Sequence, residues 1–566
     1  MKPTLLVWPI AMLIGACTNY ENCRLTTDIR IDQCGYLPQS PKMALVDDFA
    51  QKYAIIDDKG NKVLSGRPDA SQFYAEANQK YRKIDFSALN KVGTYTLVIN
   101  DTLCSYPIHI TDDVYTPLSA AALKAFYYNR SGINIDECYA GAWARQAGHP
   151  DTCVMVHKSA ASVARPVGTI ISSPRGWYDA GDYNKYIVNS GISTYTLMLA
   201  ATIYDHKAIK TSINIPETGN FIPDIWNETI YNLRWMLTMQ DPNDGGVYHK
   251  LTTLAFESFK MPNECSQQRY VVAKGTAATL DFAATMAYAS RNITKYDHTD
   301  EHKALADSCL SAAQQAYAWA EQHSNVPFVN PADVSTGEYG DATFTDEWFW
   351  AATELWLATA DNKYVEKMKA NNPAKLTVPS WGDVATLGYY SMLTEHKMPP
   401  TFRAKTTLLQ LADSLVTQSA ISPISISMTN YDWGSNSTVA NMGIVKLIAY
   451  KVTNEQRYLN SALDDVHYLL GRNPLGRCFV TGFGVNPPLN IHHRISVADT
   501  VEAPVPGLLC GGPNIVVLTD CDADSITRSQ YPAISYSDEV CSYSTNEIAI
   551  NWNAPLVCLL WGVEER

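Results

Sequence analysis

The sequence pattern changes abruptly from strand-like to helix-like at residues 115–117, and this change constrains the fold most. Before it, turns are frequent and apolar runs are short, as in strands, at 44–46, 53–56 and 95–99, with a hairpin signal at 57–61. After it, alanine-rich and amphipathic helical patterns recur, at 118–128, 305–319, 347–360, 407–418, 439–451 and 455–470. We therefore predict a mainly α protein, in which a small immunoglobulin-like β-sandwich over 28–112 precedes an α/α toroid over 115–566.

The long loops between the predicted helices are rich in glycine, proline and aromatic residues, so we expect them to build a cleft on one face of the toroid. The 566 residues carry a formal net charge of −13 and no basic cluster, which argues against nucleic acid as a partner. No phosphate-binding glycine loop, His-Glu-x-x-His or Gly-x-Ser-x-Gly motif is present. These absences leave nucleotide, metalloprotease and serine hydrolase chemistry unsupported.

The first 17 residues predict export. Lys2 precedes an apolar run over 5–14 that is too short to span a bilayer. The run ends in a sequence, residues 13–17, that resembles a bacterial lipobox, in which Cys17 is acylated and becomes the new N-terminus; simple signal cleavage is the alternative. We expect residues 18–27 to be a tether and the protein to be a monomer anchored by lipid in the outer membrane, at the cell surface or the periplasmic face.

Cysteines are scattered through the rest of the chain. Of the 13 cysteines, 12 follow Cys17, and no two of them form a Cys-x-x-Cys pair, so a zinc knuckle is not indicated. An exported protein could pair some of them, but the sequence does not give the pairing. We expect most of them to be isolated buried thiols.

The stretch 176–186 is the strongest chemical signal. Asp179 and Asp182 are three residues apart, a glycine precedes the second, and aromatic residues crowd both sides. Such a pair can face one cavity, hold a water molecule and take its proton, while flat aromatic faces can stack on sugar rings. A turn with aspartate caps is the alternative interpretation.

Later segments add the groups that glycoside hydrolysis requires. Residues 480–494 lack regular periodicity and end in His492-His493-Arg494, and Glu547 begins a mostly apolar, helix-like run. Taken alone, Glu547 could be a first-turn helix charge and either histidine a structural one. Together with the aspartate pair, they supply an acid for one side of a glycosidic bond and a base for the other.

These motifs identify a family resemblance. The chain resembles family 9 glycoside hydrolases, the inverting cellulase family, and specifically their bacterial branch with an N-terminal immunoglobulin-like domain. The matching stretches follow the same order along nearly all of the mature chain, at 29–36, 85–87, 93–95, 179–182, 433–436, 471–474, 492–494 and 538–554. The resemblance implies an (α/α)6 toroid and a β-glucan as substrate.

The resemblance also implies a role for each matching residue. Asp182 would be the general base, Asp179 would help to hold the water, and Glu547 would be the general acid. His492 and Arg494 would bind the sugar near the cleavage point. Trp177, Tyr178 and Trp433 are candidates for stacking on sugar rings, and the alternative for each is a place in the core. Tyr543 is a candidate for lining the same site. In an inverting enzyme the two carboxyls stand roughly 6.5–9.5 Å apart, which we expect for Asp182 and Glu547.

The chemistry requires no cofactor, but the resemblance raises the question of a structural metal. Relatives bind calcium near an Asp-Glu pair that opens a helix, so Asp346, Glu347 and Asp383 form a candidate calcium site, with an acidic first helical turn as the alternative. Some relatives bind zinc through cysteines and histidines just before the base loop. Arg130-Ser131-Gly132 and Gly148-His149 stand where part of that cluster would be, and Cys138 and Cys153 are not at matching positions, so we expect that zinc site to be missing.

The sequence therefore predicts an endo-β-1,4-glucanase that acts by inversion on mixed-linkage glucan, xyloglucan or amorphous cellulose. The alternative is a surface glycan-binding lipoprotein that has lost catalysis, although the three carboxylates count against it. A toroid lyase is a second alternative, but it would require a Tyr/His or Arg/Lys centre instead of the aspartate loop.

Overall fold

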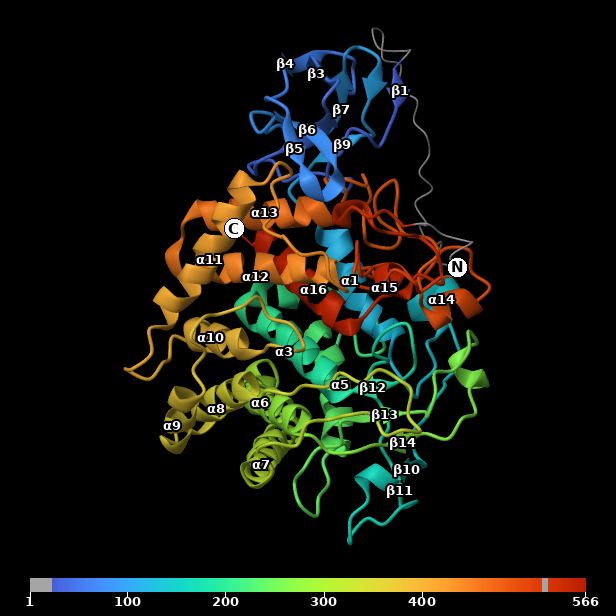
Figure 1. Cartoon of the computed structure of the whole chain (residues 1–566), viewed down its shortest axis with the longest axis vertical. Coiled ribbons are helices and arrows are strands. Elements are labelled where there is room, and N and C mark those ends of the chain that lie inside the picture. Colours follow the sequence, from blue (N-terminus) through green and yellow to red (C-terminus); the bar gives the residue numbers. More distant parts are fainter. Residues whose placement is uncertain (1–22, 522–527, 566) are drawn as a thin grey trace.

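The computed structural model describes residues 23–521 and 528–565, which form a small β part and a larger helical part (Figure 1). The β part packs a sheet of order β1-β8-β7-β3-β4, with β9 on β7, against a sheet of order β2-β6-β5. Its strands are β1 (Arg24–Leu25), β2 (Met43–Asp47), β3 (Tyr53–Asp57), β4 (Lys62–Gly66), β5 (Gln72–Tyr74), β6 (Gln79–Asp85), β7 (Gly93–Ile99), β8 (Leu103–Cys104) and β9 (Ile108–Ile110). The three predicted strands and the hairpin are confirmed by β2, β7 and the β3–β4 pair.

The predicted tether over 18–27 extends too far along the chain. Residues 24–25 form β1 and pair in parallel with β8, and a disulfide joins Cys23 to Cys104. The paired backbone and the covalent bond place residues 23–25 within the β part. The predicted signal segment, Cys17 and most of the tether lie outside the described residues.

Six helices form a closed inner ring, in which each contacts the next and the last returns to the first. They are α3 (Ile187–Ile203), α6 (Thr276–Asn292), α8 (Thr345–Thr359), α10 (Ala385–Thr394), α12 (Ser435–Thr453) and α16 (Ile550–Glu564). Six more pack outside this ring: α1 (Thr116–Tyr128), α5 (Asp224–Thr238), α7 (Asp300–Gln322), α9 (Lys363–Ala370), α11 (Ala404–Ile421) and α13 (Gln456–Leu469). This is the predicted (α/α)6 toroid, and its inner helices are mostly buried because both flanks meet neighbouring helices.

The loops on one face of the toroid carry short elements that build the site. A small five-stranded sheet contains β10 (Val154–Val156), β11 (Ile170–Ile171), β12 (Lys185–Tyr186), β13 (Lys250–Thr252) and β14 (Tyr270–Val271). Four short helices complete the fold: α2 (Glu137–Ala140), α4 (Asp205–Lys210), α14 (Arg494–Ala498) and α15 (Tyr543–Asn546). Glu547 caps α15 and precedes α16, so the expectation that it opens the last helix is wrong.

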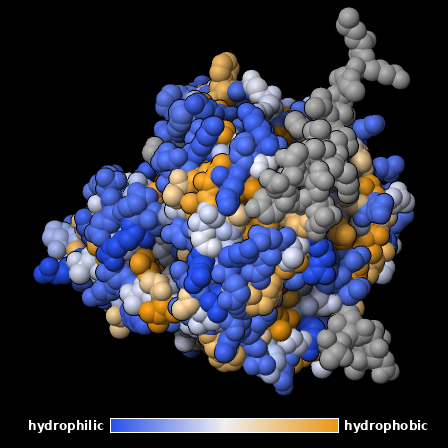
Figure 2. Space-filling view, turned by 90° about the horizontal axis from the view of Figure 1, so that it is seen from above, coloured by the Kyte–Doolittle hydropathy of each residue, from blue (hydrophilic) through white to orange (hydrophobic). Residues whose placement is uncertain are grey.

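Hydrophilic residues dominate the face shown in Figure 2, and hydrophobic residues are scattered over it in small patches. In the described part of the chain, no helix is long and apolar enough to cross a bilayer.

Candidate active site

The aspartate loop is held against the segments that carry His492 and Glu547. A side chain at Gly181 would place its Cβ 2.1 Å from the carbonyl oxygen of His492 and 3.1 Å from Glu547 Oε1. Only glycine permits this approach, because a Cβ atom never comes so close to a backbone oxygen. Gly181 therefore lets the backbone of the loop reach the other half of the site.

Asp179 lies at the base of the site, just before α3. Asn189 Nδ2 donates to both of its carboxylate oxygens, at 3.0 and 3.1 Å, and the Tyr339 hydroxyl donates to Oδ2 at 2.9 Å. Burial and, next, the charge of Asp182 raise the pKa of Asp179 to about 8. These three hydrogen bonds from two side chains fix the carboxyl group, which suits a residue that orients a water molecule.

Asp182 has a more polar surrounding than Asp179. Its Oδ2 accepts hydrogen bonds from the side chain of Asn184 at 2.5 Å and from the Tyr186 hydroxyl at 3.2 Å. Asp182 also lines the cavity described below, so its carboxylate can meet a water or a substrate there.

Glu547 is held next to the aspartate loop by a backbone hydrogen bond. The amide of Gly181 donates to its Oε1 at 3.3 Å. Burial, followed by the negative charge of Asp182, raises the pKa of Glu547 well above its ordinary value. A carboxyl group that keeps its proton near neutral pH can act as a general acid.

His492 and Arg494 join the two halves of the site. His492 Nδ1 bonds to the carbonyl of Val540 at 2.7 Å, and burial lowers the pKa of the ring, so the imidazole stays neutral. Arg494 donates to the carbonyls of Gly181 at 2.8 Å and Glu257 at 2.7 Å. Arg494 is a positioning residue here, and its predicted contact with sugar stays a prediction.

A cavity of about 350 Å³ contains Asp182 and Glu547 in its wall. Its remaining lining is largely aromatic, with Tyr186, Phe256, Tyr339, Trp381, Trp433 and Trp552. Trp433 is 45% exposed and its ring lies 5.4 Å from that of Tyr543, which in turn lies 5.8 Å from His492. Trp433 therefore lines the cavity and Tyr543 lies beside it, and the contact of either residue with a sugar stays a prediction.

Trp177 and Tyr178 are not sugar platforms. Trp177 is fully buried, packs on Phe126 and donates its Nε1 to Glu228 at 3.2 Å. The buried Tyr178 hydroxyl bonds to His149 Nδ1 at 2.9 Å. Both rings face the core behind the loop, so neither can stack on a sugar in the cavity, and the core alternative is correct for both.

Sequence reasoning missed several residues of the site. Tyr339 and Trp381 come from loops far along the chain, and Asn184, Tyr186 and Asn189 follow the aspartate loop directly. The aromatic crowding of 176–186 was a signal for Tyr186. The glycines on either side of Glu338-Tyr339 were the signal available for Tyr339.

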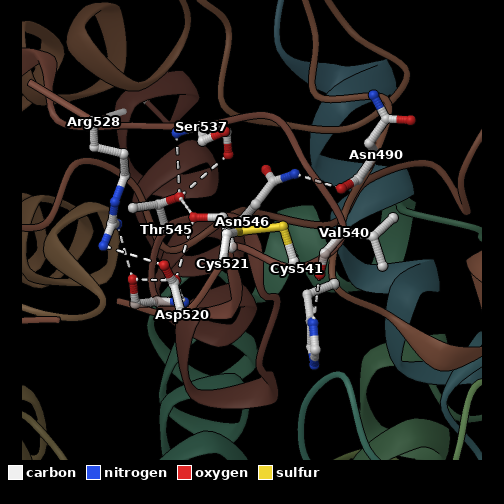
Figure 3. Close-up of a disulfide and its surroundings, with 12 residues drawn as sticks. Asn490, Asp520, Cys521, Arg528, Ser537, Val540, Cys541, Thr545 and Asn546 are labelled. Atoms are coloured by element: carbon white, nitrogen blue, oxygen red, sulfur yellow. Dashed lines mark hydrogen bonds and ion pairs between the residues drawn. A yellow bond between two sulfur atoms is a disulfide. The ribbon is translucent and has the colours of Figure 1, made fainter. Parts of the chain in front are cut away.

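A disulfide between Cys521 and Cys541 lies beside the acid segment, with Val540 and Asn546 close by (Figure 3). Asp520 accepts hydrogen bonds from the amide and the hydroxyl of Ser544, at 2.9 and 2.6 Å. The bridge and these bonds fix the short helix α15, at whose end Glu547 stands. Eight described cysteines are free, but only Cys309, Cys478, Cys510 and Cys558 among them are buried, so the expectation that most of the cysteines are isolated buried thiols is wrong.

The fold and the site together indicate a class of enzyme. The cavity of the (α/α)6 toroid holds a carboxyl group of raised pKa and a second carboxyl group that accepts hydrogen bonds, and these are the groups that a glycosidase requires. The model named "Glycosyl hydrolase family 9" matches residues 115–560, and that named "Cellulase N-terminal ig-like domain" matches 25–102. The chain belongs to glycosyl hydrolase family 9, in the branch with the N-terminal immunoglobulin-like domain, and it is a glycosidase rather than a non-catalytic glycan-binding protein.

Relatives of known name match this chain over almost its whole length. A "Xyloglucan-specific endo-beta-1,4-glucanase" of Bacteroides ovatus is 41% identical over 97% of this chain and 95% of its own. "Endoglucanase D" of Acetivibrio thermocellus is 32% identical over 97% of this chain and 85% of its own.

Solved structures agree with these relatives. The structure titled "Bacteroides ovatus GH9" superposes with a TM-score of 0.89 at 41% identity, over 96% of this chain and 99% of that one. A thermostable endoglucanase from Alicyclobacillus acidocaldarius, solved as a single mutant, gives 0.86 at 32% identity, over 96% of this chain and 100% of that one.

Proposed function

We propose that this glycosidase is an endo-β-1,4-glucanase that cleaves the backbone of xyloglucan with inversion. The observation that carries the proposal is the shared cavity of Asp182 and Glu547, in which Asp182 accepts a hydrogen bond from Asn184 and burial raises the pKa of Glu547. The xyloglucan specificity printed for the 41% identical relative supports the substrate. Mixed-linkage glucan and amorphous cellulose share the same backbone and are the competing substrates.

In the proposed mechanism, Glu547 donates its proton to the glycosidic oxygen as the bond breaks. Asp182 takes a proton from a water molecule, which Asp179 helps to hold, and the water attacks the anomeric carbon from the opposite face. Neutral His492, Arg494 and Tyr543 would surround the sugar at the cleavage point, and Trp433 would stack on a neighbouring sugar. A separation of roughly 6.5–9.5 Å between the two carboxyls belongs to this mechanism.

The test is reducing-sugar release from xyloglucan, barley β-glucan and carboxymethylcellulose. We expect Asp182→Asn and Glu547→Gln each to lower kcat by at least about 1,000-fold, because each removes a proton-transfer step of the reaction. Glu366→Gln, an exposed carboxylate of α9, is the control and should keep full activity. Proton NMR of the first product should show the α-anomer; a β-anomer would exclude inversion, and faster release from β-glucan would replace xyloglucan as the substrate.

We also propose export and lipid anchoring at Cys17, as a monomer. The two disulfides support export, because disulfides persist in oxidising compartments. Labelling cells with a fatty-acid probe should tag the wild type in the membrane fraction, whereas Cys17→Ser should be unlabelled and released. Labelling of Cys17→Ser would contradict the anchor.

We also propose a structural calcium ion at the predicted site, to which we add Asp281 as a ligand. Both carboxylate oxygens of buried Asp281 lack a hydrogen-bond partner, as does Glu347 Oε2, and Asp346 lies near both. Asp383 instead accepts a hydrogen bond from Thr377, at 2.6 Å. Buried unpaired carboxylate oxygens are the ligands that calcium prefers. Calcium should raise Tm in the wild type and not in Asp281→Asn; equal shifts would contradict this site.

A further inference from the structure

Three side chains with metal-ligating atoms converge behind the aspartate loop. His149, Glu257 and Cys265 each offer one such atom, and the three atoms all lie within 4.8 Å of one another. Within residues 23–521 and 528–565, this is the only group of three or more histidine, cysteine or acidic side chains that meets that limit. Histidine, carboxylate and thiolate are the three ligand types of protein zinc sites.

His149 presents an unpaired ring nitrogen to this group. The residue is 7% exposed and its Nε2 has no hydrogen-bond partner. The Tyr178 hydroxyl lies 2.9 Å from Nδ1 and 3.3 Å from the carbonyl of Gly148, to which it donates. When the hydroxyl donates to Gly148, Nδ1 carries the ring proton and Nε2 keeps its lone pair, which is the tautomer that a metal ion would select. Histidine ligands of metals have this arrangement, in which the second nitrogen donates to a fixed partner.

Glu257 and Cys265 come from one loop and have weak competing contacts. Glu257 Oε2 forms an ion pair with Lys260 at 3.0 Å, so a cation already stands at this carboxylate. The Cys265 thiol has only a 3.6 Å contact with the carbonyl of Met261. Oε1 of Glu257 also accepts a 3.4 Å hydrogen bond from the amide of Gln267, so a metal ion would replace Lys260 at Glu257, whereas Cys265 would give up only its 3.6 Å contact.

The charges around His149 are net positive. Arg145, Lys185 and Arg269 act on the ring as positive charges, and Asp151 is the one negative charge that acts with them. Asp151 forms ion pairs with Lys185 at 2.7 Å and Arg269 at 3.2 Å, so the carboxylate of Glu257 and the thiolate of Cys265 would have to offset the remaining positive charge as well as that of a divalent ion.

We propose that His149 Nε2, the Glu257 carboxylate and the Cys265 sulfur bind a divalent transition metal of the zinc class. Binding would displace the thiol proton to solvent, so that one metal–sulfur bond forms for each proton released. A water molecule would complete four-coordination, as in other sites with three protein ligands. His149 stands where the relatives have part of their cysteine-and-histidine cluster, whereas Glu257 and Cys265 follow the aspartate loop in the chain and replace the rest of that cluster.

A metal at this position would brace one wall of the active site. Phe256, beside Glu257, lines the cavity, and the carbonyl of Glu257 accepts the 2.7 Å hydrogen bond from Arg494. The carbonyl of Lys260 accepts a 2.7 Å hydrogen bond from Tyr183, next to Asp182. The metal would thus tie this loop to residue 149 beneath the aspartate pair.

The test is metal binding by the full chain, with cobalt as a spectroscopic probe and zinc as the competing ion. We expect the wild type to bind one equivalent, with a thiolate-to-cobalt charge-transfer band that zinc abolishes. Cys265→Ser should lose the band and bind zinc at least about tenfold more weakly, since one ligand is gone. Cys138→Ser, which alters an exposed free cysteine outside the group, should keep both properties.

Circular dichroism and thermal unfolding would show whether Cys265→Ser is folded. If Cys265→Ser is not folded, Glu257→Gln tests the metal site instead, because it keeps the shape of the side chain and removes its charge. We expect zinc to raise Tm more in the wild type than in this variant. The proposal is overturned if the wild type binds no stoichiometric cobalt, or if the folded variants bind zinc as the wild type does. Neither readout depends on the proposed glucanase activity.

Discussion

At the scale of the residue, the proton affinities of two buried carboxyl groups, those of Asp179 and Glu547, govern the site. Tyr339 donates a 2.9 Å hydrogen bond to Asp179, and this bond lowers a pKa that burial raises to about 8. Tyr339→Phe should therefore raise the pKa of Asp179 further and move the acidic limb of the kcat/KM profile to higher pH. We expect kcat/KM at pH 6 to fall about tenfold, the effect of about 1.5 kcal/mol for a hydrogen bond to a charged group.

The control for this variant is Tyr389→Phe, which removes the 2.6 Å hydrogen bond that Tyr389 donates to Asn372. Tyr389 is a buried tyrosine on α10 and lies away from the cavity. Tyr389→Phe should lower Tm without moving the pH profile. A Tyr339→Phe enzyme that loses stability but keeps the acidic limb of the wild type would refute the link to Asp179.

The raised pKa of Glu547 makes the stability of the fold depend on pH. Because the pKa is higher in the folded protein than in the unfolded chain, folding binds a proton at neutral pH. The stabilising contribution of Glu547 is complete below pH ~4.5 and is lost as the pH rises through the folded pKa. Glu547→Gln should therefore raise Tm relative to the wild type at pH 8 by about 1–2 °C and change it little at pH 4.5. Thermal unfolding across this range measures the difference, and a difference independent of pH would contradict the shift.

Single residues were predictable where a motif fixes both type and spacing, as for Asp179, Asp182 and Glu547. The sequence could not separate Trp433 from Trp177, because both are tryptophans among glycines and aromatics. Burial decides between them, and burial depends on α5, which supplies the Glu228 partner of Trp177 from 51 residues further along the chain. Tyr339 was missed for the same reason, since only the closed toroid brings it to Asp179.

At the scale of the element, the Cys521–Cys541 disulfide holds the segment that presents the acid. Val540 accepts the hydrogen bond from His492, and α15 leads from Tyr543 to Glu547. Replacing both cysteines by serine should lower kcat/KM about tenfold, because a constraint worth about 3 kcal/mol no longer restricts this segment. Steady-state kinetics on the substrate identified above measures the loss.

The second disulfide is the matched control. Replacing Cys23 and Cys104 by serine removes a bridge inside the β part, so it should lower the unfolding temperature and leave kcat/KM within about twofold at 25 °C. Equal losses of kcat/KM in both variants would mean that disulfides act here only through overall stability.

At the scale of the whole molecule, the change of periodicity at residues 115–117 was enough to predict two parts, since helices and strands bury apolar residues at different spacings. The number of helix pairs in the toroid was not derivable from periodicity, and it came from the family resemblance. The residues that form the contact between the parts were not predicted. It depends on polar backbone groups, such as the carbonyl of Pro474, which accepts a 3.1 Å hydrogen bond from Arg30 and leaves no mark in a hydropathy pattern.

That contact gives the β part an influence on the active site. Gln33 accepts hydrogen bonds from the amides of Val485 and Asn486, at 2.9 and 3.2 Å, and donates to the carbonyl of Gly476 at 2.8 Å. The anchored loop continues to His492, whose carbonyl touches Gly181 in the aspartate loop.

Gln33→Ala leaves two amide donors and one carbonyl of this loop without their partner, so the loop should lose order before the toroid does. We expect kcat/KM to fall about tenfold. Gln79→Ala, which removes a 2.8 Å hydrogen bond to Asp47 within the β part, should leave kcat/KM unchanged. Hydrogen exchange should show faster exchange in residues 483–494 of Gln33→Ala alone. If both variants keep full activity and protection, the β part supports the toroid without organising its catalytic loop.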